Sequence, residues 1–358
     1  MTNNLTPDQI KEKYWLDYIN RRKAKNDAST KKSMETGINT NPSRTTVHYL
    51  VGASASGKSR YCQNERSDIV RLSSDEIRKE LFGTLAHQRN HELVFSILHK
   101  ALGDNLNDFD AIYDATNLNR KKRKYFYADL LKQITYSSKE KPLVNIVVFI
   151  EPYEVLLKNN NLKPAGEKVP EDVITRMYRT LHVPRIGVDC DSYEVKGETP
   201  FFNTPMTYEK LISLNTVEEL YELMSEPYKN EMKALFGPHD TPYHLEDINE
   251  HINMCIENSG NDKTLKAIAL FHDLGKAFVK DGGKYIDHQY VSAMYAMKAF
   301  SEIPNMQNGE LIIEAIVQHM NAHNGLSDKV IRNNNLNQTL LTYIEAFAEI
   351  DSKSRIIE

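Results

Sequence analysis

The sequence predicts an α/β domain, in which helices cover both faces of a parallel sheet, followed by an all-α domain. Two patterns in the 358 residues lead to this fold class. Between residues 45 and 195, apolar strand-like runs alternate with helical stretches, as in a sheet covered on both faces. From residue 240 onward, strand patterns disappear and helical periodicity dominates. Because the chain is too long for one ordinary core, two domains are expected.

The chain divides into four predicted segments. Residues 7–25 have helical spacing and end in a basic run, whereas residues 26–44 are rich in Asn, Ser, Thr and Lys and have little to bury. The first helix either docks on the next domain, which is the simpler interpretation, or guides a polyanion through its basic side chains. The segments are an N-terminal helix and linker (1–44), the α/β domain (45–195), a connecting segment with a helix-like piece at 217–236 (196–239) and the helical domain (240–358).

The composition indicates a globular, cytoplasmic protein. Hydrophobic residues make up 40% of the chain, and no apolar run is long enough to cross a bilayer, so no membrane partner is expected. The N-terminus lacks the layout of a secretory signal, and Cys62, Cys190 and Cys255 lie far apart. These features argue against a disulfide framework or a thiolate metal site. A net charge of -4 gives no global attraction to nucleic acid, so such binding would need a local basic patch.

An apolar run ending at Val51 leads into a glycine-rich loop that fits the pattern G-x-x-x-x-G-K-[ST]. The loop consists of Gly52, Ala53, Ser54, Ala55, Ser56, Gly57, Lys58 and Ser59. Small residues let backbone N–H groups close around phosphate oxygens, and the next helix directs its positive end at the same anion. We expect Lys58 to contact the β- and γ-phosphates of ATP or another nucleoside triphosphate, and Ser59 to bind Mg²⁺. The alternative is a chance Gly/Ser turn, which the flanking strand and helix disfavour.

Three further strands are predicted at residues 68–72, 111–114 and 143–150, and a helix at residues 91–106. Ligands bind at the carboxyl ends of parallel strands, so polar residues that follow the strands should meet the phosphate loop at one edge of the sheet. These residues are Asp75 and Arg78 after the second strand, and Asp114, Thr116 and Asn117 after the third.

Asp75 and Arg78 are three residues apart at the start of a predicted helix, so both can face one acceptor. A carboxylate beside the γ-phosphate can take the proton from an attacking hydroxyl, and an arginine can bind a phosphate of the acceptor. The alternative is that Ser74 or Asp75 only caps the helix. A basic run, Arg120–Lys124, opens the helix after the third strand, where we expect it to contact anions.

These ordered motifs resemble those of the bacteriophage polynucleotide 5′-kinase family and related P-loop kinases, over residues 45–195. The resemblance implies ATP and Mg²⁺ binding by Lys58 and Ser59, proton abstraction by Asp75 and binding of the acceptor phosphate by Arg78. The residues that it places near the nucleotide are Asp114, Thr116 and Asn117.

In such kinases a lid helix supplies arginines to the transferring phosphate. Residues 169–179 match this region, but residues 158–163 carry lysine and asparagine where the family tends to carry arginine. A lysine neutralises charge but lacks the planar fork of arginine. The resemblance leaves three candidates, in order of preference: Arg176, Lys163 and Arg179.

Histidine and carboxylate residues recur through the second half. In chain order they are His251, His272, Asp273, His288, His319 and Asp351. Imidazole and carboxylate ligands suit one or two divalent ions of Mn, Fe, Co, Ni or Zn, which can lower the pKa of a bound water and withdraw charge from a phosphoryl group. The alternative is a metal-free helical bundle in which the histidines are core residues.

The ordered set, together with the segment Phe271–Lys276 (Phe-His-Asp-Leu-Gly-Lys), resembles the HD phosphohydrolase superfamily over residues 240–358. The resemblance implies that Lys276 contacts a substrate phosphate. His323, on the helix face of His319, is a weaker candidate for phosphate binding or proton transfer. The implied ligands are His251, His272, Asp273 and Asp351 for one metal, and His288, His319 and the bridging Asp273 for a second.

The two halves together resemble bacterial end-healing enzymes that join an HD domain to a polynucleotide kinase, although here the kinase half comes first. The resemblance implies ATP-dependent phosphorylation of 5′-OH ends of RNA or DNA, and removal of a 2′,3′-cyclic phosphate, 2′-phosphate or 3′-phosphate by the HD half. A nucleic-acid ligase acting downstream is the implied partner. Two other hypotheses remain: a small-molecule or nucleotide kinase fused to an HD nucleotidase or phosphodiesterase, and a nucleotide-dependent regulatory protein whose HD half senses a ligand.

Overall fold

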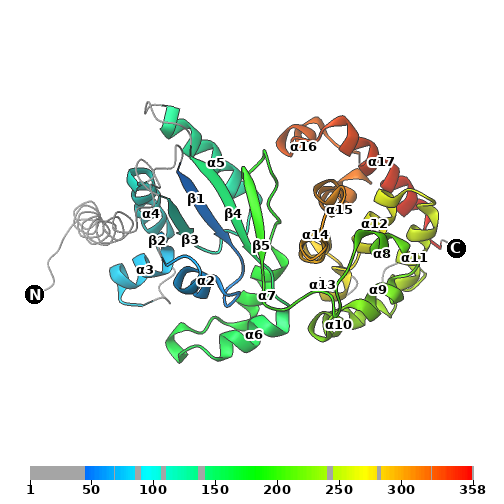
Figure 1. The fold of residues 1–358 in the computed structure, drawn as a ribbon, viewed down its shortest axis with the longest axis horizontal. Helices are drawn as coiled ribbons and strands as arrows, with labels where there is room; N and C mark the ends of the chain where they lie inside the picture. Colours follow the sequence, from blue (N-terminus) through cyan, green and yellow to red (C-terminus); the bar gives the residue numbers. More distant parts are fainter. Residues whose placement is uncertain are drawn as a thin grey trace, which may run out of the picture.

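The computed structural model of the protein describes residues 45–67, 69–84, 90–105, 110–135, 142–239, 245–279, 284–323 and 325–356. The predicted N-terminal helix and linker, residues 1–44, lie outside the described residues. An α/β half and a helical half lie next to each other along the long axis of the molecule (Figure 1). Within the described residues, no helix has the length and apolar character needed to cross a membrane.

The α/β half is built on a sheet of five parallel strands in the order β2-β3-β1-β4-β5. The strands are β1 (Thr46–Val51), β2 (Val70–Ser73), β3 (Ala111–Asp114), β4 (Leu143–Phe149) and β5 (Ser192–Lys196). The predicted parallel sheet is confirmed, with β2 beginning two residues later than expected. The sequence does not predict β5, because this edge strand is half polar (Ser-Tyr-Glu-Val-Lys) and none of its residues is fully buried.

Helices cover both faces of the sheet, as predicted (Figure 1). Alternate residues of β1 point to opposite faces. Leu50 packs in one cluster with Tyr61, whereas Tyr49 and Val51 pack in another that includes Val94. The helices of this half are α2 (Lys58–Asn64), α3 (Ser74–Phe82), α4 (His91–Asn105), α5 (Arg120–Thr135), α6 (Tyr153–Asn161), the 3₁₀ turn η1 (Ala165–Glu167) and α7 (Glu171–Arg179).

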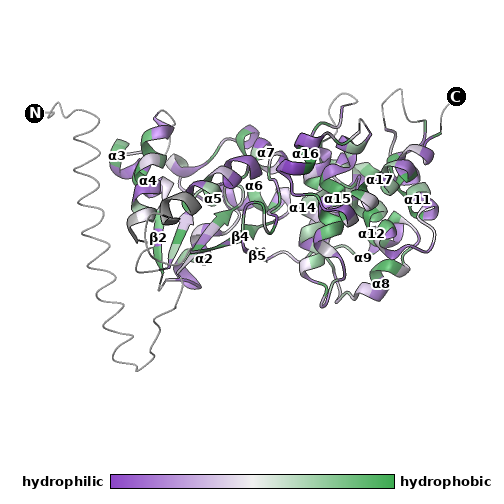
Figure 2. Cartoon of the chain, turned by 90° about the horizontal axis from the view of Figure 1, so that it is seen from above, coloured by the Kyte–Doolittle hydropathy of each residue, from purple (hydrophilic) through white to green (hydrophobic). Residues whose placement is uncertain are grey.

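In the helical half, apolar residues concentrate on three central helices, α12, α14 and α15 (Figure 2). The elements that precede α12 in the chain are α8 (Tyr208–Ser213), α9 (Val217–Leu223), α10 (Glu226–Met232), the 3₁₀ turn η2 (Lys233–Leu235) and α11 (Ile248–Asn258). The remaining helices are α12 (Lys263–Phe271), α13 (Lys276–Val279), α14 (His288–Ser301), α15 (Gly309–Ala322), α16 (Asp328–Asn333) and α17 (Gln338–Lys353).

The connecting segment packs on the helical half, with α8 against α12 and α9 against α11. Residues 217–236, predicted as one helix-like piece, are divided into α9, α10 and η2. The break falls at Met224 and Ser225, which are extended, and Pro227 lies in the first turn of α10, where its missing N–H costs no helical hydrogen bond.

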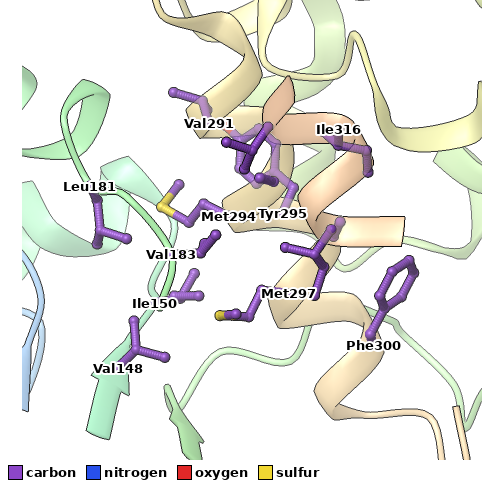
Figure 3. Close-up of a cluster of buried hydrophobic side chains, with 14 of the residues drawn as sticks. Val148, Ile150, Leu181, Val183, Val291, Met294, Tyr295, Met297, Phe300 and Ile316 are labelled. Atoms are coloured by element: carbon purple, nitrogen blue, oxygen red, sulfur yellow. The ribbon is translucent and has the colours of Figure 1, made fainter. Parts of the chain in front are cut away.

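One apolar core runs from the sheet into the helical half. Val148, Ile150 and Val183 of the α/β half face Met294 and Met297 of α14 (Figure 3), and all five side chains are buried. Because this apolar surface is removed from water on both sides, the two halves are held together as one packed unit.

A buried carboxylate, Glu231 of α10, lies where the two halves meet. It accepts hydrogen bonds from Tyr178 Oη of α7 (3.0 Å), Tyr295 Oη of α14 (2.9 Å) and the backbone N–H of Tyr153. Burial raises the pKa of Glu231 from 4.5 to about 7, although the three hydrogen bonds favour the ionised form.

We expect Glu231 to make the protein less stable as the pH rises from about 4.5 to about 7, because over this range the unfolded chain releases a proton that the folded chain retains. The loss amounts to about 3 kcal/mol and stays constant above pH 7. In urea denaturation, Glu231→Gln should therefore gain stability relative to the wild type as the pH increases through this window. Glu226→Gln, an exposed change on the same helix, is the control. A wild-type-to-variant difference that does not vary with pH contradicts this account.

Candidate functional site

The phosphate loop joins the end of β1 to the start of α2 at the carboxyl edge of the sheet (Figure 1). Gly57 has a φ of 97°, a conformation that glycine adopts at little cost. A Cβ added at Gly52 would lie 2.7 Å from Ser56 Oγ and 3.0 Å from Phe149 Cβ. Both glycines are therefore needed for the shape of this loop.

Lys58 bends back over the loop that precedes it. Its Nζ donates to the carbonyl oxygens of Gly52 (2.9 Å) and Ala53 (2.6 Å). Burial lowers the pKa of Lys58 to about 8, whereas the nearby carboxylates of Asp114 and Asp75 oppose this shift. A partly desolvated ammonium group at this position can exchange its carbonyl partners for phosphate oxygens.

Arg71 of β2, which the sequence analysis does not single out, connects Ser59, the predicted Mg²⁺ ligand, with Asp114, which the resemblance places near the nucleotide. Its Nε lies 2.9 Å from Asp114 Oδ2, and its NH2 lies 3.4 Å from Ser59 Oγ. Ser59 and Asp114 thus both lie next to the Arg71 guanidinium, and a hydroxyl and a carboxylate are oxygen ligands that suit Mg²⁺. A charged residue between two apolar ones of a predicted strand, Val70 and Leu72, is the signal that could have revealed Arg71.

Asp75 and Arg78 form an ion pair on the first turns of α3, with Arg78 NH1 2.8 Å from Asp75 Oδ1. The Arg78 side chain is buried, but that of Asp75 is 69% exposed. The residue that caps α3 is Ser73, whose side chain accepts a hydrogen bond from the Glu76 backbone N–H. The alternative in which Asp75 or Ser74 serves only as the cap is therefore wrong.

Among the lid candidates, Lys163 contacts the phosphate loop, with its Nζ 2.9 Å from Ser54 Oγ. Asn159 of α6 also reaches the loop and donates to Ala55 O (3.2 Å). Arg176 is exposed on α7, and Arg179 points toward the helical half, 3.5 Å from Ile286 O. Lys163, which the sequence analysis ranks second after Arg176, is thus the candidate in contact with the phosphate loop.

Thr116 and Asn117 form hydrogen bonds with the backbone at the start of the phosphate loop. The carbonyl oxygen of Thr116 accepts from the Gly52 N–H (3.0 Å), and Asn117 Nδ2 donates to Leu50 O (2.7 Å). Both residues therefore hold the end of β3 next to the end of β1, and they position the loop through its backbone.

The basic run at the start of α5 is a correction to the sequence analysis. Arg120 is buried and pairs with Glu314 of the helical half (2.8 Å), and Arg123 is buried and pairs with Asp189 (2.8 Å). The expectation that the run contacts anions is wrong for these two arginines, because internal carboxylates already neutralise them.

In the helical half, the six predicted metal ligands converge, although they come from segments that are separated in sequence. Two groups form, and the ligand atoms within each lie within 4.8 Å of one another. All members are buried. The first group is His251, Cys255, His272 and Asp351, and the second is Asp273, His288 and His319.

Cys255 is the unexpected member, because the wide spacing of the cysteines argues against a thiolate site. Spacing between cysteines is uninformative here, since the other ligands of the group are not cysteines. Cys255 follows His251 by one helical turn on α11, and its Sγ lies 3.7 Å from His251 Nε2.

The four cluster histidines share one arrangement of their rings. Each Nδ1 lies 2.7–2.9 Å from a backbone carbonyl oxygen, which can only accept, so each Nδ1 carries the hydrogen. The Nε2 atoms therefore present lone pairs to the interior, as in metal-binding histidines, whose other ring nitrogen usually donates to a carbonyl or carboxylate oxygen. The carbonyls belong to Ser354, Ala269, Tyr285 and Ile316.

These nitrogen atoms face one another at short range, an arrangement that a proton or a metal cation between them stabilises. His288 Nε2 lies 3.1 Å from His319 Nε2 and 3.1 Å from Asp273 Oδ1. Asp273 Oδ1 is buried and has no hydrogen-bond partner in the described structure. Burial lowers the pKa of His319 to about 3, which keeps this ring neutral and able to ligate. The residues thus fit divalent transition metals.

Two side chains beside the cluster orient its carboxylates. Lys276 Nζ lies 2.6 Å from Asp273 Oδ2 and 3.1 Å from Nε2 of His239, a buried residue that the sequence analysis does not identify. His323 Nε2 lies 2.7 Å from Asp351 Oδ2, which leaves Oδ1 of that carboxylate 3.2 Å from His251 Nε2. His323 is therefore placed to position Asp351.

Two stretches of the chain match known family models. Residues 47–184 match the model of an AAA domain, and residues 241–350 match that of an HD domain. No curated protein matches the chain. The first stretch contains the phosphate loop and the strands of the sheet other than β5, which imply a nucleotide with Mg²⁺. The second contains most of the histidine–aspartate cluster, which implies divalent metals. The chain thus joins a kinase-like P-loop domain of the AAA-domain type to a helical HD domain.

Proposed function

We propose that the protein heals the ends of nucleic acids. Its P-loop half transfers the γ-phosphoryl group of ATP to 5′-OH ends of RNA or DNA, and its HD half removes a 2′,3′-cyclic phosphate or a 2′- or 3′-phosphate. The observation that carries the first activity is the Asp75–Arg78 pair next to the phosphate loop, because this loop alone would only bind a nucleotide.

In the transfer step, Asp75 takes the proton of the attacking 5′-hydroxyl. The hydroxyl oxygen forms a bond to the γ-phosphorus, and the bond from the γ-phosphorus to ADP breaks. The charge of the Asp75 carboxylate opposes the lowering of the pKa that burial imposes on both Lys58 and Lys163. These two lysines supply positive charge to the transferring group, and Arg78 holds a phosphate of the acceptor. Mg²⁺ on Ser59 and Asp114 would neutralise the β- and γ-phosphates.

The exposure of Asp75 favours a polymer as the acceptor. Sites for small molecules enclose most of the ligand surface. Here the side chain that would receive the acceptor proton is 69% exposed, while its partner Arg78 is buried. A site with this shape admits the end of a long strand, whose remaining nucleotides stay outside.

In the HD half, water displaces the 2′ or 3′ oxygen from phosphorus. The metals would lower the pKa of water and withdraw charge from the phosphoryl group when bound. The protein contributes ligands whose rings are fixed by backbone carbonyls, and Lys276 adds positive charge beside Asp273.

The test of this function is a comparison of acceptors. The protein is incubated with ATP labelled at the γ-phosphate, Mg²⁺, and either 5′-OH RNA and DNA oligonucleotides or free nucleosides and sugars. We expect label on an oligonucleotide and none on the small molecules. Label on nucleosides alone overturns the proposal in favour of a small-molecule kinase, and ATP binding without transfer to any acceptor favours a regulatory protein.

We expect Asp75→Asn to lower 5′-phosphorylation by about 10²- to 10⁴-fold, because the amide cannot take a proton. ATP binding should be unchanged, since the phosphate loop is intact, and equilibrium binding of a fluorescent ATP analogue measures it. Asp172→Asn, an exposed change on α7, is the matched control. Labelling at the wild-type rate in Asp75→Asn would remove this carboxylate from the chemistry.

A further inference from the structure

The two groups of ligands in the HD half differ in number and in chemistry. The first offers two imidazoles, a carboxylate and a thiol, from His251, His272, Asp351 and Cys255. The second offers two imidazoles and one carboxylate, from His288, His319 and Asp273. The resemblance to HD phosphohydrolases assigns Asp273 to both metals and gives Cys255 no role.

The distances from His251 to the other three members of the first group match those expected between ligands of a tetrahedral site. For bonds of about 2.0–2.1 Å to nitrogen and about 2.3 Å to sulfur, tetrahedral ligands lie about 3.3 Å (N···N) and about 3.6 Å (N···S) apart. Measured from His251 Nε2, the distances are 3.4 Å to His272 Nε2, 3.2 Å to Asp351 Oδ1 and 3.7 Å to Cys255 Sγ. The thiol sulfur therefore stands at the distance expected of a ligand.

The orientation of Asp273 is an independent reason to assign Cys255 to the first group. One oxygen of Asp273, Oδ2, is 2.6 Å from the ammonium group of Lys276. The other, Oδ1, is buried without a hydrogen-bond partner in the described structure and faces His288 Nε2 at 3.1 Å. Oδ2 also lies 3.2 Å from His272 Nε2 and 3.5 Å from His251 Nε2, so Asp273 borders the first group as well, but this oxygen is already paired with the Lys276 ammonium group. The unpaired oxygen of Asp273 faces the second group, which leaves the thiol of Cys255 as the unpaired candidate ligand of the first.

The sulfur is also held in place and shielded from water. Cys255 is fully buried on α11, one turn after His251. His251 Nδ1 donates to Ser354 O (2.8 Å), which turns its Nε2 toward the sulfur. Both side chains therefore face the same point without rearrangement of the helix.

We propose that Cys255 is the fourth ligand of a closed metal site formed with His251, His272 and Asp351, next to an open three-ligand site. Binding breaks the S–H bond, releases the proton to solvent and forms a metal–sulfur bond. Thiolate makes this position favour Zn²⁺ or Co²⁺ over Mn²⁺ and Mg²⁺. A closed site holds its ion tightly, whereas the open site keeps positions for water and a phosphate oxygen.

The test is titration of the metal-free full-length protein with Co²⁺, followed by absorption spectroscopy. We expect a near-ultraviolet thiolate-to-cobalt charge-transfer band that is complete with the first equivalent. Cys255→Ser should lose this band and bind the first Co²⁺ at least about 100-fold more weakly. The affinity for Mn²⁺ should change far less. His288→Ala should keep the band and lose the second equivalent.

Cys190→Ser, a change of another buried cysteine in the α/β half, is the matched control and should retain the band. Retained ATP binding shows that each variant is folded. No band in the wild type, or a band that persists in Cys255→Ser, overturns the assignment. Because the titration contains no substrate, its result is independent of the acceptor experiment on the proposed function.

Discussion

Replacing Asp273 with asparagine is expected to lower release of phosphate from 3′-phosphate ends by about a thousandfold or more. The Asp273 carboxylate lies 3.1 Å from His288 Nε2 and 3.2 Å from His272 Nε2, so it borders both groups of ligands. Loss of the Asp273 charge weakens metal binding. The bound metal stabilises the transition state by several kcal/mol, and loss of this stabilisation corresponds to the expected change in rate. Phosphate release and bound metal per chain are both measured.

The kinase half serves as an internal control for folding, because Asp273→Asn should still phosphorylate 5′-OH ends. Lys58→Ala should give the reverse pattern, with 5′-phosphorylation reduced by at least about 10²-fold and phosphate release retained. Asp328→Asn, an exposed change on α16, should leave both activities unaltered. Phosphate release at the wild-type rate in Asp273→Asn would remove this residue from the metal centre.

Replacing Glu314 with alanine is expected to destabilise the protein by about 3–5 kcal/mol. Glu314 of α15 is buried and pairs with two arginines of the α/β half, Arg120 (2.8 Å) and Arg185 (3.1 Å), and it accepts from Gln318 Nε2 (2.8 Å). Its removal leaves two guanidinium groups at the contact between the halves without their carboxylate.

The free energy of unfolding of Glu314→Ala is measured by urea denaturation. Glu345→Ala, an exposed change on α17, should shift stability by less than about 0.5 kcal/mol. Glu314→Gln keeps the shape and some hydrogen bonds, so we expect an intermediate loss. A loss in Glu314→Ala no larger than in Glu345→Ala would show that this ion pair does not stabilise the contact.

The sequence predicts the features that depend on short, ordered motifs. The phosphate loop is contiguous, and its glycines are required by the local backbone, as the contacts of a Cβ at Gly52 demonstrate. The metal ligands are separated in sequence, but the order His, His-Asp, His, His, Asp is a pattern in itself. Both therefore lead to the fold class and to the residues that converge in space.

The features that the sequence does not predict depend on tertiary contacts. Arg120 and Arg123 look like an exposed basic run until Glu314 and Asp189 are placed beside them. Cys255 can be recognised as a candidate ligand only once the fold places it next to His251 and His272. Strand β5 is not predicted for a similar reason, because its pairing with β4 is set by the sheet and not by the local residue pattern.

The most direct test uses one oligonucleotide that carries both a 5′-OH and a 3′-phosphate end, in matched RNA and DNA forms, incubated with the wild-type protein, ATP and Mg²⁺ or Mn²⁺. Mass spectrometry of the two termini then reports each half separately. We predict a strand that has gained a phosphate at its 5′ end and lost the phosphate at its 3′ end. A strand with both termini unchanged, under conditions in which the protein binds ATP and metal, would contradict the account.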